Sequence, residues 1–326
     1  MFRKLKIRQM KFLPDFSDIE KAHELIEGYI NYTPVLTSRS INNITGGKLF
    51  FKCENFQKTG AFKFRGACNA VFSLTADGDE LQNGVATHSS GNHAAALALA
   101  AKIRGIKSNI VMPVTSPEIK KSAVAEYGGR ITFCEPTLEA RESSLAEIVR
   151  ETGAKEIHPY NNFYVIAGQG TAAKELIEEA GRFDIIMAPV GGGGLISGTA
   201  ITVKTLSQKC RVIAAEPAGA DDAYHSFQSR KLIPSKNPHT IADGLLTSLG
   251  ARTFAVILDK VDGIVTVSEE KIVEAMRMIW ERMKIIIEPS SAVPLAAILE
   301  GKVDVQNKKV GIILSGGNVD LNKLPF

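Results

Sequence analysis

Short runs of apolar and β-branched residues recur along this chain of 326 residues, and segments of helical periodicity lie between them. The strand-like runs cover residues 48–52, 84–87, 109–114, 130–134, 184–190, 211–215 and 310–314. The helical segments cover residues 93–103, 116–127, 139–151 and 171–180. Such runs are typical of buried strands, and their alternation with helices is typical of parallel sheets covered on both faces. The chain is therefore predicted to be an α/β protein built on open, doubly wound sheets.

Residues that begin and end helices agree with this pattern. Ser116 stands before Pro117, which predicts an N-cap followed by a first-turn proline, and Gly128 predicts the end of the same helix. Ser268 predicts the N-cap of another helix, which runs toward Met283.

Length and charge limit the class of protein. Domains usually hold about 50 to 250 residues, so 326 residues suit two lobes with a cleft between them. The formal net charge of the chain is +4. Five basic residues precede the first acidic residue, so the rest of the chain has a net charge of −1; the five are Arg3, Lys4, Lys6, Arg8 and Lys11. A nearly neutral body argues against a nucleic-acid partner. No run of 18 apolar residues is present, so no membrane span is expected.

Cysteine usage bears on the compartment. The four cysteines are widely spaced and form no C-x-x-C pair; they are Cys53, Cys68, Cys134 and Cys210. This pattern is typical of reduced thiols and predicts a cytoplasmic protein. The alternative is mitochondrial, because the basic N-terminal segment also resembles a short targeting sequence.

Four consecutive glycines follow the strand-like run 184–190 and precede a helix of small residues from Leu195. They are Gly191, Gly192, Gly193 and Gly194, called here the glycine loop. Glycines let backbone N–H groups converge on an anion, and a helix N-terminus favours negative charge. The spacing matches neither G-x-G-x-x-G nor G-x-x-x-x-G-K-[ST], which disfavours a dinucleotide or a nucleoside triphosphate. The loop is predicted to bind a phosphate group, and a turn without a ligand is the alternative.

Two further polar loops follow strand-like runs. Ser315 begins a Ser-Gly-Gly-Asn sequence, and Ser89, Ser90, Gly91 and Asn92 precede an alanine-rich helix. Ligands of open α/β sheets bind at the carboxyl ends of strands, so Ser315 is expected to contact a cofactor, and a plain turn is the alternative. The other loop suits a carboxylate, with a helix cap by Ser90 or Asn92 as the alternative.

Lys63 stands between Phe62 and Phe64. Apolar surroundings disfavour the charged amine, and a neutral lysine amine is a nucleophile for carbonyl groups. Taken alone, Lys63 is better explained by a surface lysine whose stem lies along aromatic rings.

These segments occur together with ordered motifs at 33–36, 89–93, 166–171, 240–244 and 315–321. From about Asp18 to Leu321 the chain resembles the fold-type II, or tryptophan-synthase-β-like, pyridoxal-phosphate enzymes. Within them it resembles the serine racemase and serine/threonine dehydratase group. The resemblance implies a large cofactor-binding domain of residues 1–80 and 159–326, a small mobile domain of residues 81–158 that closes on the substrate, and a homodimer.

The resemblance also implies roles for individual residues. Lys63 would carry pyridoxal phosphate as a Schiff base, with Phe62 against its ring, Asn92 at its phenolic oxygen and Ser315 at its pyridine nitrogen. The glycine loop and Leu195 would hold the phosphate. The substrate carboxylate would be held by Ser89, Ser90, Gly91, Asn92 and His93, with help from Arg141.

Two reactions are compatible with this set. Serine at the pyridine nitrogen does not keep the ring protonated, which disfavours transamination and leaves racemisation and β-elimination. Racemisation needs an acid/base group on each side of the substrate Cα, whereas elimination needs one base and an exit for hydroxide. Lys63 serves one side, and the resemblance implies Ser90 for the other, because dedicated threonine dehydratases tend to have alanine there.

We therefore predict a racemase that interconverts L- and D-serine and also eliminates serine to pyruvate and ammonia. The sequence His158-Pro159-Tyr160-Asn161 is more similar to dehydratases, so a dehydratase of serine, threonine or threo-3-hydroxyaspartate stays the alternative. A non-catalytic paralogue is less favoured, because both Lys63 and the glycine loop are present.

Further ligands follow from the same resemblance. Glu216, Ala220 and Asp222 match two carboxylates and a backbone carbonyl that bind a cation, and oxygen ligands suit Mg²⁺, Mn²⁺ or Ca²⁺. The alternative is that Asp221 or Asp222 caps the following helix. Ala95 stands where many relatives carry glutamine near an ATP site, so ATP as an allosteric activator is left open.

Overall fold

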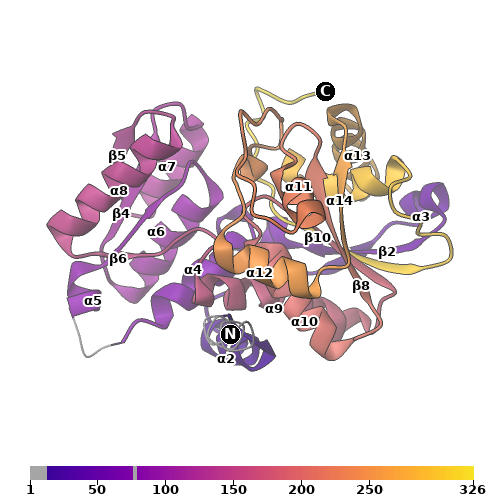
Figure 1. Cartoon of the computed structure of the whole chain (residues 1–326), viewed down its shortest axis with the longest axis horizontal. Coiled ribbons are helices and arrows are strands. Elements are labelled where there is room, and N and C mark those ends of the chain that lie inside the picture. Colours follow the sequence, from indigo (N-terminus) through magenta and orange to yellow (C-terminus); the bar gives the residue numbers. More distant parts are fainter. Residues whose placement is uncertain (1–12, 76–78) are drawn as a thin grey trace.

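Two separate sheets organise the chain, which the computed structural model describes over residues 13–75 and 79–326 (Figure 1). One sheet has six strands in the order β1-β2-β10-β7-β8-β9, and the other has four in the order β5-β4-β3-β6. Every pair of neighbouring strands is parallel except β1 with β2. The predicted α/β architecture with two open sheets is therefore confirmed.

The six-stranded sheet consists of β1 (Val35–Thr37), β2 (Lys48–Cys53), β7 (Ile185–Pro189), β8 (Arg211–Pro217), β9 (Gly263–Val267) and β10 (Lys309–Leu314). The four-stranded sheet consists of β3 (Val85–His88), β4 (Ser108–Pro113), β5 (Arg130–Cys134) and β6 (Lys155–Glu156). The α-helices are α2 (Phe16–Ile26), α3 (Arg39–Thr45), α4 (Lys63–Phe72), α5 (Asp79–Asn83), α6 (Asn92–Arg104), α7 (Glu118–Glu126), α8 (Leu138–Thr152), α9 (Phe163–Ala180), α10 (Gly194–Leu206), α11 (Asp222–Ser229), α12 (Ala251–Lys260), α13 (Glu269–Met283) and α14 (Pro289–Leu299). Short 3-10 turns are η1 (Glu54–Phe56), η2 (Lys58–Gly60) and η3 (Asp243–Leu245).

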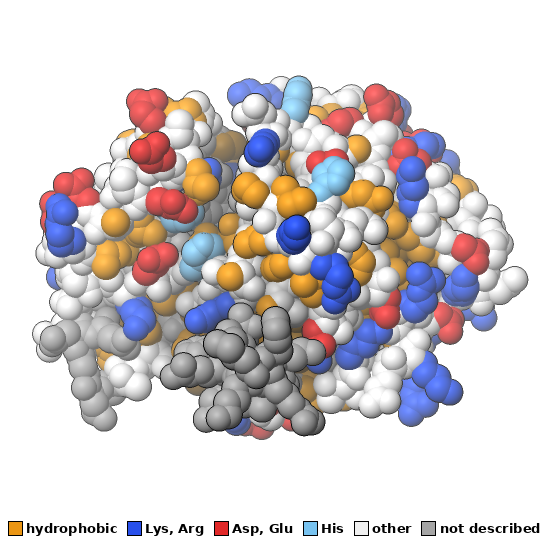
Figure 2. Space-filling view, in the orientation of Figure 1, with side chains coloured by type: hydrophobic (Ala, Val, Ile, Leu, Met, Phe, Trp, Pro, Cys, Tyr) orange, Lys and Arg blue, Asp and Glu red, His pale blue; other side chains and the backbone are white. Residues whose placement is uncertain are grey.

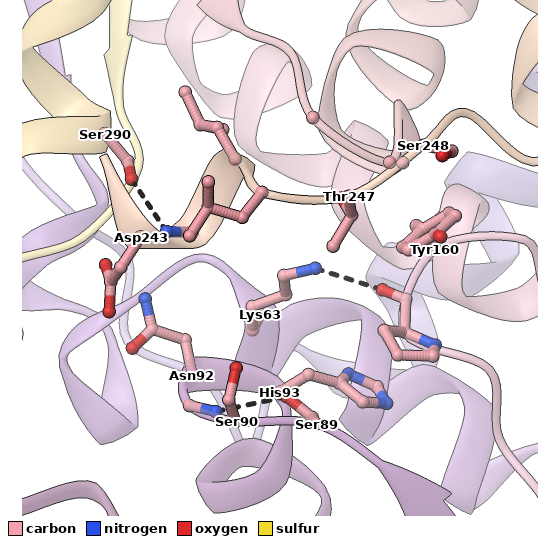
Figure 3. A pocket seen from close by; sticks show the side chains of 18 of the residues that line it. Lys63, Ser89, Ser90, Asn92, His93, Tyr160, Asp243, Thr247, Ser248 and Ser290 are labelled. Atoms are coloured by element: carbon pink, nitrogen blue, oxygen red, sulfur yellow. Dashed lines mark hydrogen bonds between the residues drawn. The ribbon is translucent and has the colours of Figure 1, made fainter. Parts of the chain in front are cut away.

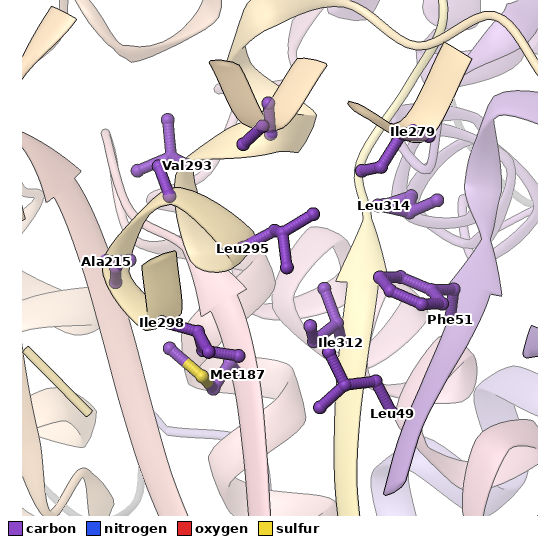
Figure 4. Packing of buried hydrophobic residues seen from close by; sticks show 14 of the residues in the cluster. Leu49, Phe51, Met187, Ala215, Ile279, Val293, Leu295, Ile298, Ile312 and Leu314 are labelled. Atoms are coloured by element: carbon purple, nitrogen blue, oxygen red, sulfur yellow. The ribbon is translucent and has the colours of Figure 1, made fainter. Parts of the chain in front are cut away.

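Alternate residues of the central strands pack into different apolar clusters on the two faces of the larger sheet. Met187, Ile312 and Leu314 pack with α13 and α14 (Figure 4). Ile186 and Ile313 pack with α9 and α10 on the other face. Because successive side chains of a strand point to opposite faces, a strand covered on both faces is apolar throughout. This explains why β7 and β10 were predictable as continuous apolar runs.

Three strands, β1, β6 and β9, were not predicted. β1 and β6 hold three and two residues, too few for a periodic pattern, and β9 is a partly buried strand at the edge of its sheet. The strands of the smaller sheet all lie between Val85 and Glu156. They fall inside the predicted small domain of residues 81–158, whose boundaries stay a prediction.

The predicted N-cap of helix α7 was wrong. Pro117, not Ser116, occupies its N-cap position and makes no side-chain cap. The N–H of Ser116 donates to the carbonyl of Pro113 at 3.0 Å, so the serine closes a turn and lies one residue too early to cap the helix. The other two predicted ends are confirmed: Gly128 follows α7 with φ of +79°, and Ser268 caps α13.

Helix α9 packs against helices α4 and α10. A Cβ on its Gly168 would lie 2.6 Å from the carbonyl oxygen of Arg65 in α4. A Cβ on Gly198 of α10 would lie 2.5 Å from the nitrogen of Gly170 in α9. Only glycine permits such close approach of helix backbones. Because α4 begins at Lys63 and α10 begins in the glycine loop, α9 sets the position of one relative to the other.

A buried ion network ties α4 to the larger sheet; it consists of Lys52, Glu54, Arg65 and Glu175. Arg65 donates from Nε to Glu54 at 2.7 Å and from Nη1 to Glu175 at 2.6 Å, and Lys52 donates to Glu175 at 2.6 Å. None of these side chains is more than 1% exposed. Two cations face two carboxylates, so the network carries no net charge. It joins β2, η1, α4 and α9.

Both lobes carry acidic and basic side chains on the face drawn in Figure 2. Among residues 13–75 and 79–326, the structure contains no helix with the length and hydropathy that a membrane span requires. The basic N-terminal segment noted in the sequence lies outside the described residues.

Replacing Gly168 by alanine tests the packing of α4 on α9. The added methyl group would overlap the backbone of α4, which cannot yield as a side chain does, so a loss of about 1–3 kcal/mol in the free energy of unfolding is expected. Gly28→Ala is the matched control, because nothing lies within 4 Å of its added methyl group. Urea denaturation measures both variants. Equal stabilities for the two would contradict the packing role of Gly168.

Candidate active site

A cavity of about 730 Å³ lies between the two lobes and receives residues from both (Figure 3). Its walls include the segments that follow β3, β7 and β10, where these parallel strands end. Open α/β sheets bind ligands at this edge. Lys63, Ser90, Ser315 and the glycine loop, which were predicted from separate segments, all line this one cavity.

Lys63 opens helix α4 and reaches into the cavity. Its Nζ donates a hydrogen bond of 3.1 Å to the carbonyl of Pro159 (Figure 3) and lies 5.1 Å from the centroid of the Phe62 ring. Burial lowers the pKa of Lys63 to about 8, against an opposing effect of the carboxylate of Glu288. The desolvation inferred from the flanking aromatic residues is therefore present. A lysine of this kind readily supplies the neutral amine that attacks a carbonyl.

The glycine loop presents unpaired backbone N–H groups. No N–H between Gly191 and Leu195 donates to another residue of the described chain, although all five residues are buried. Buried N–H groups are almost always paired, so this set requires an acceptor, and its position at the N-terminus of α10 favours an anion. Gly193 has φ of +87°, and a Cβ on Gly192 would collide with the ring of Tyr160. The loop fits the phosphate of a cofactor.

Ser315 follows β10 and is 2% exposed. Its Oγ lies 3.1 Å from the Oγ of Ser291, and the hydroxyl of Ser291 donates to the carbonyl of Gly316 at 2.6 Å. The carbonyl of Ser315 accepts a hydrogen bond of 2.9 Å from the N–H of Phe62, beside Lys63. A neutral hydroxyl is thus fixed at the cavity wall. It lacks the negative charge that would keep a pyridine nitrogen protonated.

The loop of residues 89–92 does not cap the helix that follows. Gly91 occupies the N-cap position of α6 and provides no side chain, which excludes capping by Ser90 or Asn92. The Oγ of Ser89 accepts a hydrogen bond of 3.3 Å from the N–H of Gly91, whereas the hydroxyl of Ser90 has no partner within the described residues. The N–H groups of Asn92 and His93 also lack an acceptor there. These groups are available to a carboxylate.

Arg141, on α8, lines the same cavity. Its Nε donates to the carbonyl of Thr137 at 3.2 Å, and it forms no ion pair with any residue of the described ranges. Its predicted contact with the substrate carboxylate stays a prediction.

Three histidines line the cavity, of which only His93 was predicted. Burial lowers the pKa of His88 and of His158 to about 4, so both are neutral near pH 7. The Nε2 of His93 lies 3.2 Å from the carbonyl of Ile157 and must donate to it, which leaves its Nδ1 as an acceptor. The histidines therefore add polar groups without positive charge.

Sequence reasoning also assigned no role to four charged residues of the cavity, Lys120, Glu142, Asp243 and Glu288. Lys120 on α7 forms an ion pair with Asp243 in η3. The Nδ2 of Asn92 donates to Glu288 at 2.9 Å. The only local signal was the position of Glu288 in an otherwise apolar stretch, between Ile287 and a proline.

The proposed cation ligands lie together at the end of β8. Glu216 accepts hydrogen bonds from the N–H groups of Ala223 and Tyr224, at 3.1 and 2.9 Å. Asp222 accepts one from Leu249 at 3.3 Å, and its Oδ1 is buried without a partner among the described residues. Burial raises the pKa of Glu216 to about 9 and that of Asp222 to about 6. Two buried carboxylates without a cationic partner fit a metal ion, and no side-chain cap from Asp221 competes with that interpretation.

A lysine of lowered pKa, a glycine loop that fits a phosphate and a neutral hydroxyl at one edge of a parallel sheet are the features expected of a pyridoxal-phosphate enzyme of fold type II. The model of the family described as pyridoxal-phosphate dependent enzyme matches residues 26–316. The chain belongs to this family, and the predicted cofactor is confirmed at that level.

Individual relatives agree. Serine racemase of Dictyostelium discoideum is 55% identical over 312 residues, which cover 94% of this chain and 95% of that protein. The beta-hydroxyaspartate dehydratase of Paracoccus denitrificans (strain Pd 1222) is 52% identical over 315 residues, covering 97% and 99%. The structure of maize serine racemase matches with a TM-score of 0.92 and 47% identity, covering 95% of each chain. The predicted resemblance to the serine racemase and dehydratase group is confirmed.

The lowered pKa of Lys63 makes cofactor capture dependent on pH. The amine must lose its proton before it attacks an aldehyde, so cofactor-free protein should bind pyridoxal phosphate faster as the pH rises toward 8 and reach a plateau above it. An unperturbed lysine, with a pKa of 10.5, would show no such plateau. The growth of a visible absorption band after mixing measures the rate, and Lys63→Ala is expected to give no band. A rate that rises well beyond pH 8 would contradict the assignment.

Proposed function

We propose that this enzyme is a serine racemase that interconverts L- and D-serine and also converts serine to pyruvate and ammonia by β-elimination. The observation that carries the proposal is the hydroxyl of Ser90. It lines the same cavity as Lys63, takes no part in capping α6 and has no partner within the described chain. Both side chains stand in this cavity, on different segments of the chain (Figure 3).

Bound pyridoxal phosphate supplies an electron sink for negative charge at the substrate Cα. The residues around it divide the remaining work. The glycine loop and Leu195 hold the phosphate, Ser315 faces the ring nitrogen, and the loop of residues 89–93 orients the carboxylate with Arg141. Lys63 takes or returns the Cα proton on one side, and Ser90 does so on the other.

A dehydratase is the second candidate, and one observation favours it. Tyr160, in the stretch that resembles dehydratases, packs on the glycine loop and lines the cavity. The relative at 52% identity that is named beta-hydroxyaspartate dehydratase makes threo-3-hydroxyaspartate the natural second substrate to assay, beside threonine.

Removal of the Ser90 hydroxyl separates the two reactions. Ser90→Ala is expected to lower the formation of D-serine from L-serine by at least about 100-fold, because one of two acid/base groups is lost. Pyruvate formation from L-serine should persist, since Lys63 alone begins that reaction. Chiral chromatography measures D-serine, and Ser143→Ala, on the surface of α8, is the control. Pyruvate without D-serine from the unaltered enzyme would establish the dehydratase instead.

We further propose that Glu216, Asp222 and the carbonyl of Ala220 bind a divalent cation, with Mg²⁺, Mn²⁺ and Ca²⁺ as candidates. The buried, unpaired Oδ1 of Asp222 and the absence of a compensating cation beside Glu216 in the described chain support this site. Hard cations of this kind take oxygen ligands.

Removal of the cation should lower thermal stability. A ligand that binds only the folded state stabilises it, so a chelator is expected to lower the melting temperature by on the order of 5 °C and added Mg²⁺ to restore it. Asp222→Asn should abolish this response. Asp221→Asn is the matched control, because the neighbouring carboxylate is 43% exposed and pairs with His225. A melting temperature that ignores both chelator and cation would contradict the site.

The remaining proposals concern assembly and compartment. We propose a homodimer in the cytoplasm, with residues 81–158 closing on the substrate. The four cysteines are free and buried, which supports a reducing compartment. Ala95 is 5% exposed within an apolar cluster and offers no hydrogen-bonding side chain, so this position supplies no polar contact to ATP.

A further inference from the structure

Asn92 is held by partners on both ends of its side-chain amide. Its Nδ2 lies 2.9 and 3.0 Å from the two carboxylate oxygens of Glu288, and its Oδ1 accepts a hydrogen bond of 2.9 Å from Asn318. The nitrogen faces an acceptor and the oxygen faces a donor, so the amide cannot rotate by half a turn without breaking both contacts. Its orientation in the cavity is therefore determined by these neighbours.

These contacts join parts of the two lobes. Asn92 is the first residue of α6, beside the four-stranded sheet, whereas Glu288 precedes α14 and Asn318 follows β10 of the larger sheet. Asn318 also donates to the carbonyl of Thr59 at 2.8 Å, in the turn that leads to Lys63. Asn92 thus reaches its position only when the two lobes are together.

Glu288 is a firm anchor for this contact. The residue is only 2% exposed, and its backbone N–H donates to the carbonyl of Gly316 at 3.0 Å. The preceding carbonyl, of Ile287, accepts a hydrogen bond of 3.0 Å from the indole of Trp280. The backbone of Glu288 is fixed on both sides, next to the Ser315 loop.

The charge of Glu288 has a counterpart outside its direct contacts. Burial raises the pKa of Glu288 to about 7. Lys120, which pairs with Asp243 and faces Glu288 from α7, opposes that shift, as does the N–H of Asn318. The anion in turn favours the charged form of Lys63. Glu288 therefore interacts electrostatically with Lys120 of the smaller lobe and with Lys63.

We infer that Glu288 is a positioning residue: it fixes Asn92, across the boundary between the lobes, in the orientation that serves the phenolic oxygen of the cofactor. The inference rests on the proposed function, in which Asn92 contacts that oxygen. Glu288 acts through Asn92, whose amide nitrogen it binds. Without it, the amide of Asn92 loses its acceptor and the closed arrangement loses one of its polar contacts.

A double-mutant cycle on cofactor binding tests this. Glu288→Ala is expected to weaken the binding of pyridoxal phosphate roughly tenfold or more, the effect of losing a hydrogen bond to a charged group. In an Asn92→Ala background the same change should have less than about a twofold effect, because the partner is already gone. Quenching of Trp280, the one tryptophan of the chain, measures affinity, and the visible absorption band reports the cofactor environment. Glu270→Ala, exposed on α13, is the control.

Two conservative variants separate positioning from folding. Glu288→Gln keeps an acceptor for Asn92 and should restore affinity to within about threefold, while loss of the charge shifts the visible band. Glu288→Asp keeps the charge but shortens the reach, so it should weaken binding as alanine does. These two variants test the inference even if Glu288→Ala does not fold.

Equal effects of Glu288→Ala in both backgrounds, or wild-type affinity for Glu288→Asp, would overturn the inference. Absence of the visible band from the unaltered protein would refute the proposed function instead.

Discussion

The buried ion network of Lys52, Glu54, Arg65 and Glu175 holds the framework on which the site depends. Removing one member would leave a charge buried without compensation, which typically costs about 3–5 kcal/mol. In the structure, the arrangement of β2, η1, α4 and α9 pairs all four groups. Because Arg65 lies two residues after Lys63 on the same helix, the network also determines where the nucleophilic amine stands.

From this framework the contacts extend to both walls of the cavity. The glycine contacts of α9 set α4 and α10 at a fixed separation, so the amine of Lys63 and the N–H groups of the glycine loop face the same space. The hydrogen bond between Phe62 and Ser315 adds the end of β10. On the side of the larger sheet the cavity wall is thus held by helix packing and backbone hydrogen bonds, whereas the side of the smaller sheet joins it through Asn92 and Lys120.

The parts of the site that were predictable share a local cause. The glycine loop, Ser315 and the loop of residues 89–92 each follow a recognisable buried strand, and strand ends of parallel sheets converge on one edge. Ser116 shows the limit of local reasoning, because the N–H of this serine bonds back to Pro113 and so displaces the expected cap. The contacts of Glu288 with Asn92 and of Tyr160 with the glycine loop could not be predicted locally, because the partners lie far away in the chain.

The order of amino acids was sufficient to predict the α/β class and the family, and to single out the glycine loop and Lys63 as candidate site residues. These features follow from periodicity, backbone freedom and short motifs, which act over a few neighbouring residues. The fold supplied the rest: the shift in the pKa of Lys63, the freedom of the Ser90 hydroxyl and the contact between Asn92 and Glu288. Burial, electric field and hydrogen-bond pairing depend on which distant surfaces meet, and that is settled only when the two sheets and their helices pack together.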